Sequence, residues 1–278
     1  MKGLAVVALL LASAAHGQQT VIFSTGNPDG RVGMASRPAS AFASAREAAD
    51  DFLLLQQTSI TSATFVGLLP SGSNAADISG VTIGIYRIFP LDSDAPPSGN
   101  VPTRANSPSD VAFDSRTSGS GLTFTATTLG NFFVANSVVD GIHPSPNSHT
   151  GGEGPVAGTE FSFSVDFLTP FVLPADHYFF VPQVALSNGT FLWLSAAHPI
   201  EAPGTPFVPD LQTWMRGPDI DPDWLRVGTD IIGAPETFNG TFSLSGIVTT
   251  TPEPSMLVLL GSGLLLIGIA TLRQRASD

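Results

Sequence analysis

Apolar and polar residues alternate along several stretches of this chain with the two-residue period of β-strands. In 161–167 (FSFSVDF), phenylalanine and valine alternate with serine and aspartate, which predicts one buried and one solvated face. The stretches 122–128 (LTFTATT) and 81–89 (VTIGIYRIF) repeat this pattern, and 59–69 and 241–248 are also predicted to be strands.

Three other local signals concern turns, a helix and loops. Asn188 and Gly189 separate two apolar, β-prone runs, and both tolerate the positive φ of a type I′ turn, so they predict a β-hairpin. The alanine-rich stretch 40–51 (SAFASAREAADD) predicts a short helix. Turn-forming residues fill 91–110 and 141–158, which predicts long surface loops.

Many short strands, few helices and irregular loops predict an all-β fold for residues 18–250. The expected architecture is an antiparallel β-sandwich with jelly-roll-like topology, built as one domain. The alternative is two smaller sandwiches divided within the loop 143–158.

The N-terminus has the parts of a secretory signal peptide, predicted for residues 1–17. Lys2 precedes an apolar run, 4–12, and Ala15-His16-Gly17 is a small-x-small site after which signal peptidase would cut, before Gln18. Export through the Sec machinery is therefore expected. The alternative is a short buried helix, since this run is too short to span a bilayer comfortably.

The C-terminus contains a second apolar segment, 256–272, which is 17 residues long and carries no charge. At 1.5 Å per residue it would extend about 26 Å, near the lower limit for a transmembrane helix. The tail 273–278 begins with Arg273 and contains Arg275, and the positive-inside rule places these arginines in the cytoplasm. The body is then expected on the opposite side of the membrane.

The order of Pro252-Glu253-Pro254, an apolar helix and a basic tail resembles the PEP-CTERM sorting signal of Gram-negative bacteria, here 251–278. The resemblance implies cleavage near Pro-Glu-Pro by an exosortase, with transient anchoring and then delivery to the cell surface or extracellular matrix. The alternative is an ordinary stop-transfer anchor after a proline-rich linker. The recognition residues that the resemblance implies are Pro252, Glu253, Pro254, Arg273 and Arg275.

Charge and cysteine content exclude several functions. The chain has 11 Lys+Arg against 23 Asp+Glu, a formal net charge of -12, so it offers no cationic surface for nucleic acid. It contains no cysteine, which excludes disulfides, thiolate metal sites and cysteine nucleophiles.

One acidic stretch resembles a calcium loop in its spacing. The carboxylates concerned are Asp219, Asp221, Asp223 and Asp230. Trp224 stands where an EF-hand needs glycine, so the two interpretations are a non-EF calcium loop and a solvated acidic turn. Apart from this calcium, no cofactor is expected. Trp214 and Trp224 lie in polar, loop-like neighbourhoods, which makes them candidates for stacking against sugar rings.

Catalytic motifs are absent from the sequence. His143, His149, His177 and His198 have no metal-binding spacing, and no G-x-S-x-G occurs. Glutamates are few, although a pair of carboxylates acting on a glycan would be brought together only by the fold. We therefore expect a non-enzymatic protein.

Three functional hypotheses follow. The first is an exported surface or extracellular-matrix protein whose body binds or organises exopolysaccharide, which the association of this sorting system with exopolysaccharide production implies. The alternatives are an extracellular glycan-active hydrolase and a purely structural surface protein.

Overall fold

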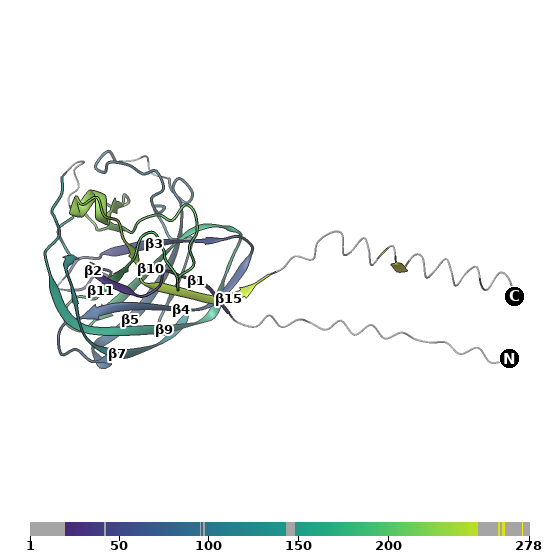
Figure 1. Ribbon diagram of the computed structural model, residues 1–278, viewed down its shortest axis with the longest axis horizontal. Helices are drawn as coiled ribbons and strands as arrows, with labels where there is room; N and C mark the ends of the chain where they lie inside the picture. Colours follow the sequence, from purple (N-terminus) through teal and green to yellow (C-terminus); the bar gives the residue numbers. More distant parts are fainter. Residues whose placement is uncertain are drawn as a thin grey trace.

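The computed structural model describes residues 20–41, 43–94, 96, 98–142, 148–249, 261, 263, 264 and 274. In this part of the chain two β-sheets pack against each other, with few helical residues (Figure 1). The prediction of a mostly β protein is confirmed. No helix within the described residues is both long and apolar enough to span a membrane.

The larger sheet has nine strands in the described residues. They are β1 (Thr20–Ser24), β2 (Pro28–Ala35), β4 (Thr58–Leu69), β7 (Leu122–Val134), β8 (Asn136–Val138), β9 (Val156–Leu173), β11 (Leu192–Ala196), β14 (Asn239–Gly240) and β15 (Phe242–Val248). Strand β4 lies in the interior of the sheet, with β9 along one edge and β15 and β11 along the other. Because β2 and β8 run parallel, this sheet is mixed, which corrects the expectation of wholly antiparallel pairing.

The smaller sheet has six strands in the described residues, and all of its pairs are antiparallel. They are β3 (Glu47–Leu54), β5 (Ile78–Arg87), β6 (Asp114–Thr117), β10 (Asp176–Leu186), β12 (Trp214–Arg216) and β13 (Leu225–Arg226). Two short helical segments complete the described elements, a 3₁₀ turn η1 (Ala75–Asp77) and a π-helical turn η2 (Val227–Ile232).

The predicted strand patterns are confirmed. In β9, Phe161, Phe163 and Val165 are buried, whereas Ser164 and Asp166 are exposed. Strands before the loop 143–158 pair with strands after it, β4 with β9 and β5 with β10. The chain therefore does not divide into two sandwiches at that loop.

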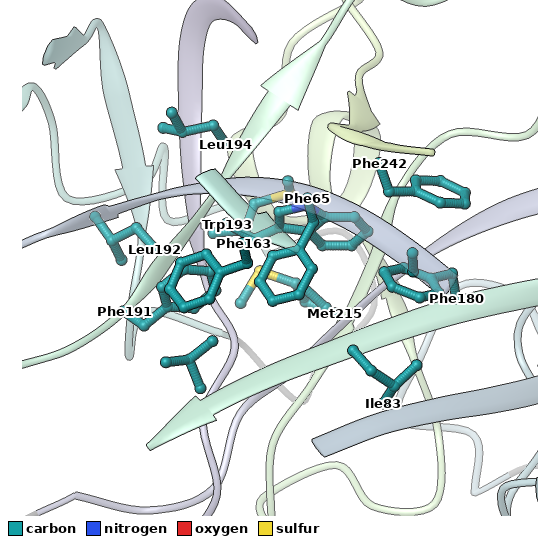
Figure 2. Packing of buried hydrophobic residues seen from close by; sticks show 14 of the residues in the cluster. Phe65, Ile83, Phe163, Phe180, Phe191, Leu192, Trp193, Leu194, Met215 and Phe242 are labelled. Carbon is teal, nitrogen blue, oxygen red and sulfur yellow. The ribbon is translucent and has the colours of Figure 1, made fainter. Parts of the chain in front are cut away.

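Aromatic side chains fill the space between the two sheets (Figure 2). Phe65 of β4 stacks on Phe163 of β9 with ring centroids 4.7 Å apart. Phe180 of β10 stacks on Phe242 of β15 at 4.8 Å, which joins the smaller sheet to the larger. Offset stacking adds about 0.5–1.5 kcal/mol per pair to the benefit of burying the rings.

The helix predicted for 40–51 is wrong. Residues 47–54 form β3, which pairs with β10 on one side and β12 on the other. Ala48 and Ala49 are completely buried. Helix propensity is a weak preference, and burial between two neighbouring strands overrides it here.

The hairpin predicted at Asn188 and Gly189 is also wrong. The two flanking strands belong to different sheets, because β10 pairs with β3 and β5, whereas β11 pairs with β2, β4 and β14. Only Gly189 has a positive φ, of 80°, whereas a type I′ turn needs two such residues. The segment instead carries the chain from one sheet to the other.

Candidate functional site

The outward face of the larger sheet carries rows of small polar side chains. One row across β7, β9, β4 and β15 consists of Thr125, Ser164, Thr64 and Ser243. A second row, two residues further along each strand, consists of Thr123, Asp166, Ser62 and Ser245. Adjacent strands lie about 4.8 Å apart, so each row presents polar groups at regular spacing.

A hollow of about 600 Å³ lies on this face, over β4, β9 and β15, and is called the β4–β9 groove below. Its polar lining includes Ser24, Asn27, Thr64, Glu160, Ser162 and Ser243. The side chains of Val21 and Leu129 add apolar edges, since they are 65% and 55% exposed. Pro203, from the connection between β11 and β12, also lines the groove.

Glu160 is the carboxylate of the groove. It lies on β9 opposite Gly130, where the register with β7 shifts at a bulge next to Leu129. Partial burial raises the pKa of Glu160 above its ordinary value. Within the described residues its carboxylate has no hydrogen bond or ion pair, so both oxygens can accept hydrogen bonds from a ligand.

The groove has the chemistry of a site for a hydroxyl-rich ligand. Hydroxyl groups both donate and accept hydrogen bonds, as shown by Thr64 Oγ1 and Ser243 Oγ, which lie 2.6 Å apart. Glu160 adds a charged acceptor, and the apolar edges suit the carbon faces of sugar rings. Glycoside hydrolysis generally uses two carboxylates, whereas the groove lining contains one.

The acidic stretch predicted as a calcium loop does not bring its carboxylates together. Three of them pair with different arginines, Asp221 with Arg216, Asp223 with Arg104 and Asp230 with Arg226. The fourth, Asp219, is exposed. Across the described residues, no three or more His, Cys, Asp or Glu side chains are grouped to hold a metal. These observations correct the calcium-loop prediction, because arginines neutralise three of the carboxylates separately and the fourth is exposed.

The stacking prediction for Trp214 and Trp224 is wrong. Their exposed fractions are 2% and 0%, so neither ring face is open to a sugar. Trp224 Nε1 donates to the carbonyl oxygen of Ser109, and the guanidinium of Arg216 lies 4.4 Å from the centre of a Trp224 ring. Polar neighbours in sequence indicated exposure, but the arginine and the surrounding backbone cover this ring.

Carboxylates and histidines meet where β3 lies beside the segment 197–213. His177 Nε2 lies 2.5 Å from Asp51 Oδ2. Burial raises the pKa of Asp51 to about 6, and this increase exceeds the opposing effect of the hydrogen bond and charge of His177. His198 Nε2 lies 3.0 Å from the carbonyl oxygen of Asp210. Both histidines therefore have partners within the protein.

Some predicted residues lie outside the described part of the chain. They are His143 and the sorting-signal residues Pro252, Glu253, Pro254, Arg273 and Arg275. His149 is described, and its Nδ1 lies 3.1 Å from the carbonyl oxygen of Asp230.

Comparisons with protein-family models, with curated proteins and with solved structures gave no match for this chain. The site is therefore argued from its geometry. The alternation in 161–167 already places Glu160 on the outward face of its strand, which is the signal that could have selected it. Pro203 and Ser24, which also line the groove, come from distant parts of the chain, and sequence spacing does not bring them there.

Proposed function

We propose that this chain is an exported surface or extracellular-matrix protein whose body binds or organises exopolysaccharide. The observation that carries the binding proposal is the β4–β9 groove, set in a face covered with hydroxyl groups and containing the unpaired carboxylate of Glu160. A polysaccharide presents many hydroxyl groups, which can replace water at Thr64, Ser162 and Ser243.

The proposed architecture is a jelly-roll-like β-sandwich. Support comes from the two packed sheets and their shared aromatic core. A sheet face of this kind offers a broad surface on which an extended glycan can lie across several strands. The loops at its margin then set which part of the glycan fits.

The proposed route to the surface rests on the two terminal segments. Signal peptidase and the Sec machinery act at the N-terminus, and an exosortase cleaves at the C-terminal sorting signal. Intact mass of the protein recovered from the cell surface tests this route. The expected mass corresponds to about residues 18–251, and a mass that retains 256–278 would contradict processing.

Co-sedimentation of the purified full-length chain with the host's own extracellular polysaccharide tests the binding proposal. The same tubes are assayed for new reducing ends. We expect the protein to pellet with the polysaccharide without releasing reducing ends. Release of reducing ends would favour the glycan-active hydrolase, and protein that stays in solution would favour a purely structural role.

A further inference from the structure

Three neighbouring residues around β3 and β14 each have a buried side-chain oxygen without a hydrogen-bond donor. These oxygens are Oδ1 of Asp50, Oδ1 of Asp210 and Oδ1 of Asn239. Asp50 and Asn239 are completely buried. Buried polar atoms normally have partners, and an unpaired one costs about 1–3 kcal/mol. Three such atoms in one neighbourhood therefore point to a ligand.

Hydrogen bonds hold the three side chains in place and connect them. The N–H of Gly240, the residue after Asn239, donates to Asp50 Oδ2 at 3.0 Å. Asn239 Nδ2 donates to the carbonyl oxygen of Ala197 at 3.0 Å and lies 3.5 Å from Asp210 Oδ2. Each side chain is thus fixed through one polar atom, while its other oxygen remains unpaired.

The amide orientation of Asn239 follows from these bonds. Exchanging its nitrogen and oxygen would place an oxygen against the carbonyl of Ala197, two acceptors in contact. The unpaired atom is therefore the amide oxygen, which is a type of atom that can bind a metal ion.

The negative charge of this cluster has little compensation. Neither Asp50 nor Asp210 forms an ion pair with an arginine among the described residues, and His177 pairs with Asp51 instead. Burial, and then the charges of Asp51 and Asp210, raise the pKa of Asp50 well above its ordinary value. His198 faces the cluster too, but it bonds the backbone oxygen of Asp210 and the hydroxyl of Thr237.

We propose that Asp50, Asp210 and Asn239 form a calcium site. Two carboxylates and an amide oxygen are hard ligands, which suit Ca²⁺ and not a thiolate- or imidazole-preferring metal. Ca²⁺ also tolerates irregular geometry better than Mg²⁺, and water can fill its remaining positions. Two of the proposed ligands are acidic and the third is an amide. The site therefore differs from a group of three His, Cys, Asp or Glu side chains, which the described residues do not contain.

The site would join three parts of the fold. Asp50 lies on β3 of the smaller sheet, Asn239 on β14 of the larger sheet, and Asp210 on the segment 197–213. Asp210 is only half-buried and comes two residues after Val208, which is 88% exposed, so this side of the proposed site lies nearest to solvent. Bound calcium would pin the segment to both sheets. This inference does not depend on the proposed function.

Terbium luminescence and thermal unfolding of the full-length chain test the site. Terbium replaces calcium and is excited through a nearby tryptophan. Trp193 is close enough for this, because its ring packs directly against Gly240, the residue after Asn239. A Cβ added at Gly240 would lie 2.4 Å from the ring. We expect saturable terbium emission that calcium displaces, and a melting temperature that rises with calcium at about 0.1–1 mM.

The Asp50→Asn and Asp210→Asn variants keep the side-chain size and remove one charge each. We expect each to weaken calcium affinity by on the order of tenfold, because ligand charge sets affinity. The matched control is Asp219→Asn, at an exposed aspartate of the acidic stretch, which should leave the calcium response unchanged. All variants are compared in chelator first, to establish that they fold.

If one aspartate variant fails to fold, the other aspartate variant and the displacement of terbium by calcium in the wild-type chain still test the site. Three results would overturn the proposal. One is no saturable response up to about 10 mM calcium. Another is a response lost in Asp219→Asn, and the last is a response unchanged in both Asp50→Asn and Asp210→Asn.

Discussion

The ion pair between Asp223 and Arg104 lies inside the protein, with side chains 0% and 3% exposed. Asp223→Ala would leave the guanidinium of Arg104 buried with Asp110, 2.6 Å away, as its remaining carboxylate. Removing one partner of a buried pair costs about 3–5 kcal/mol, because the other charge stays desolvated. Since Asp110 remains, we expect a loss near the lower end, about 3 kcal/mol.

Urea unfolding followed by tryptophan fluorescence measures this loss, because Trp224, next in the chain, is buried. For a body of this size, 3 kcal/mol corresponds to a melting temperature lower by roughly 6–12 °C. The control, Asp219→Ala, removes an exposed carboxylate and should change stability by no more than about 0.5 kcal/mol.

Two results would refute this reasoning about Asp223. A loss below about 1 kcal/mol would mean that the pair is not desolvated as the structure has it. A loss found in calcium but absent in chelator would make Asp223 a metal ligand and restore the calcium-loop prediction.

Three further predictions concern packing and pH. Gly158→Ala should destabilise the body by about 1–3 kcal/mol, because the new Cβ would lie 2.2 Å from the backbone oxygen of Leu69; unchanged urea unfolding would contradict this. Phe163→Ala should cost about 3–5 kcal/mol in the same assay, because the ring is fully buried; a loss under about 1 kcal/mol would oppose the core described above. Burial raises the pKa of both tyrosines, that of Tyr178 to about 12 and that of Tyr86 further, so the stability they contribute is complete below pH 10 and is lost as pH rises through the folded-state values. Absorbance should show no tyrosinate at pH 10 in the folded protein, and a tyrosinate signal there would be the opposite outcome.

Local alternation predicted much of the larger sheet correctly. In 161–167 each apolar residue is buried, because one face of β9 packs on the core and the other faces solvent. Strands buried on both faces lack this signal. In β3 the residues from Ala48 to Phe52 are all buried, so no alternation is visible and alanine propensity led to the helix prediction.

Contacts between distant residues decided the rest. The pairing partners of β10 and β11 lie far away in sequence, so the Asn-Gly pair gave no indication that the strands separate into two sheets. Arg104 and Arg216 neutralise carboxylates of the acidic stretch, and Arg216 covers Trp224; no spacing rule connects these residues. Asp50 and Asn239 are likewise brought together only by the packing of the two sheets.

The proposal that the β4–β9 groove binds polysaccharide depends on Glu160. The matched pair Glu160→Gln and Asp166→Asn tests it, since both carboxylates lie on the outward face of β9, about 20 Å apart along the strand, and only Glu160 lines the groove. The measurement is the dissociation constant for oligosaccharides prepared from the co-sedimenting polysaccharide. A hydrogen bond to a charged group contributes about 1.5–3 kcal/mol, so Glu160→Gln should weaken binding by roughly 10- to 100-fold while Asp166→Asn leaves it unchanged. Equal affinity in wild type and Glu160→Gln, or a larger loss in Asp166→Asn, would contradict the proposed site.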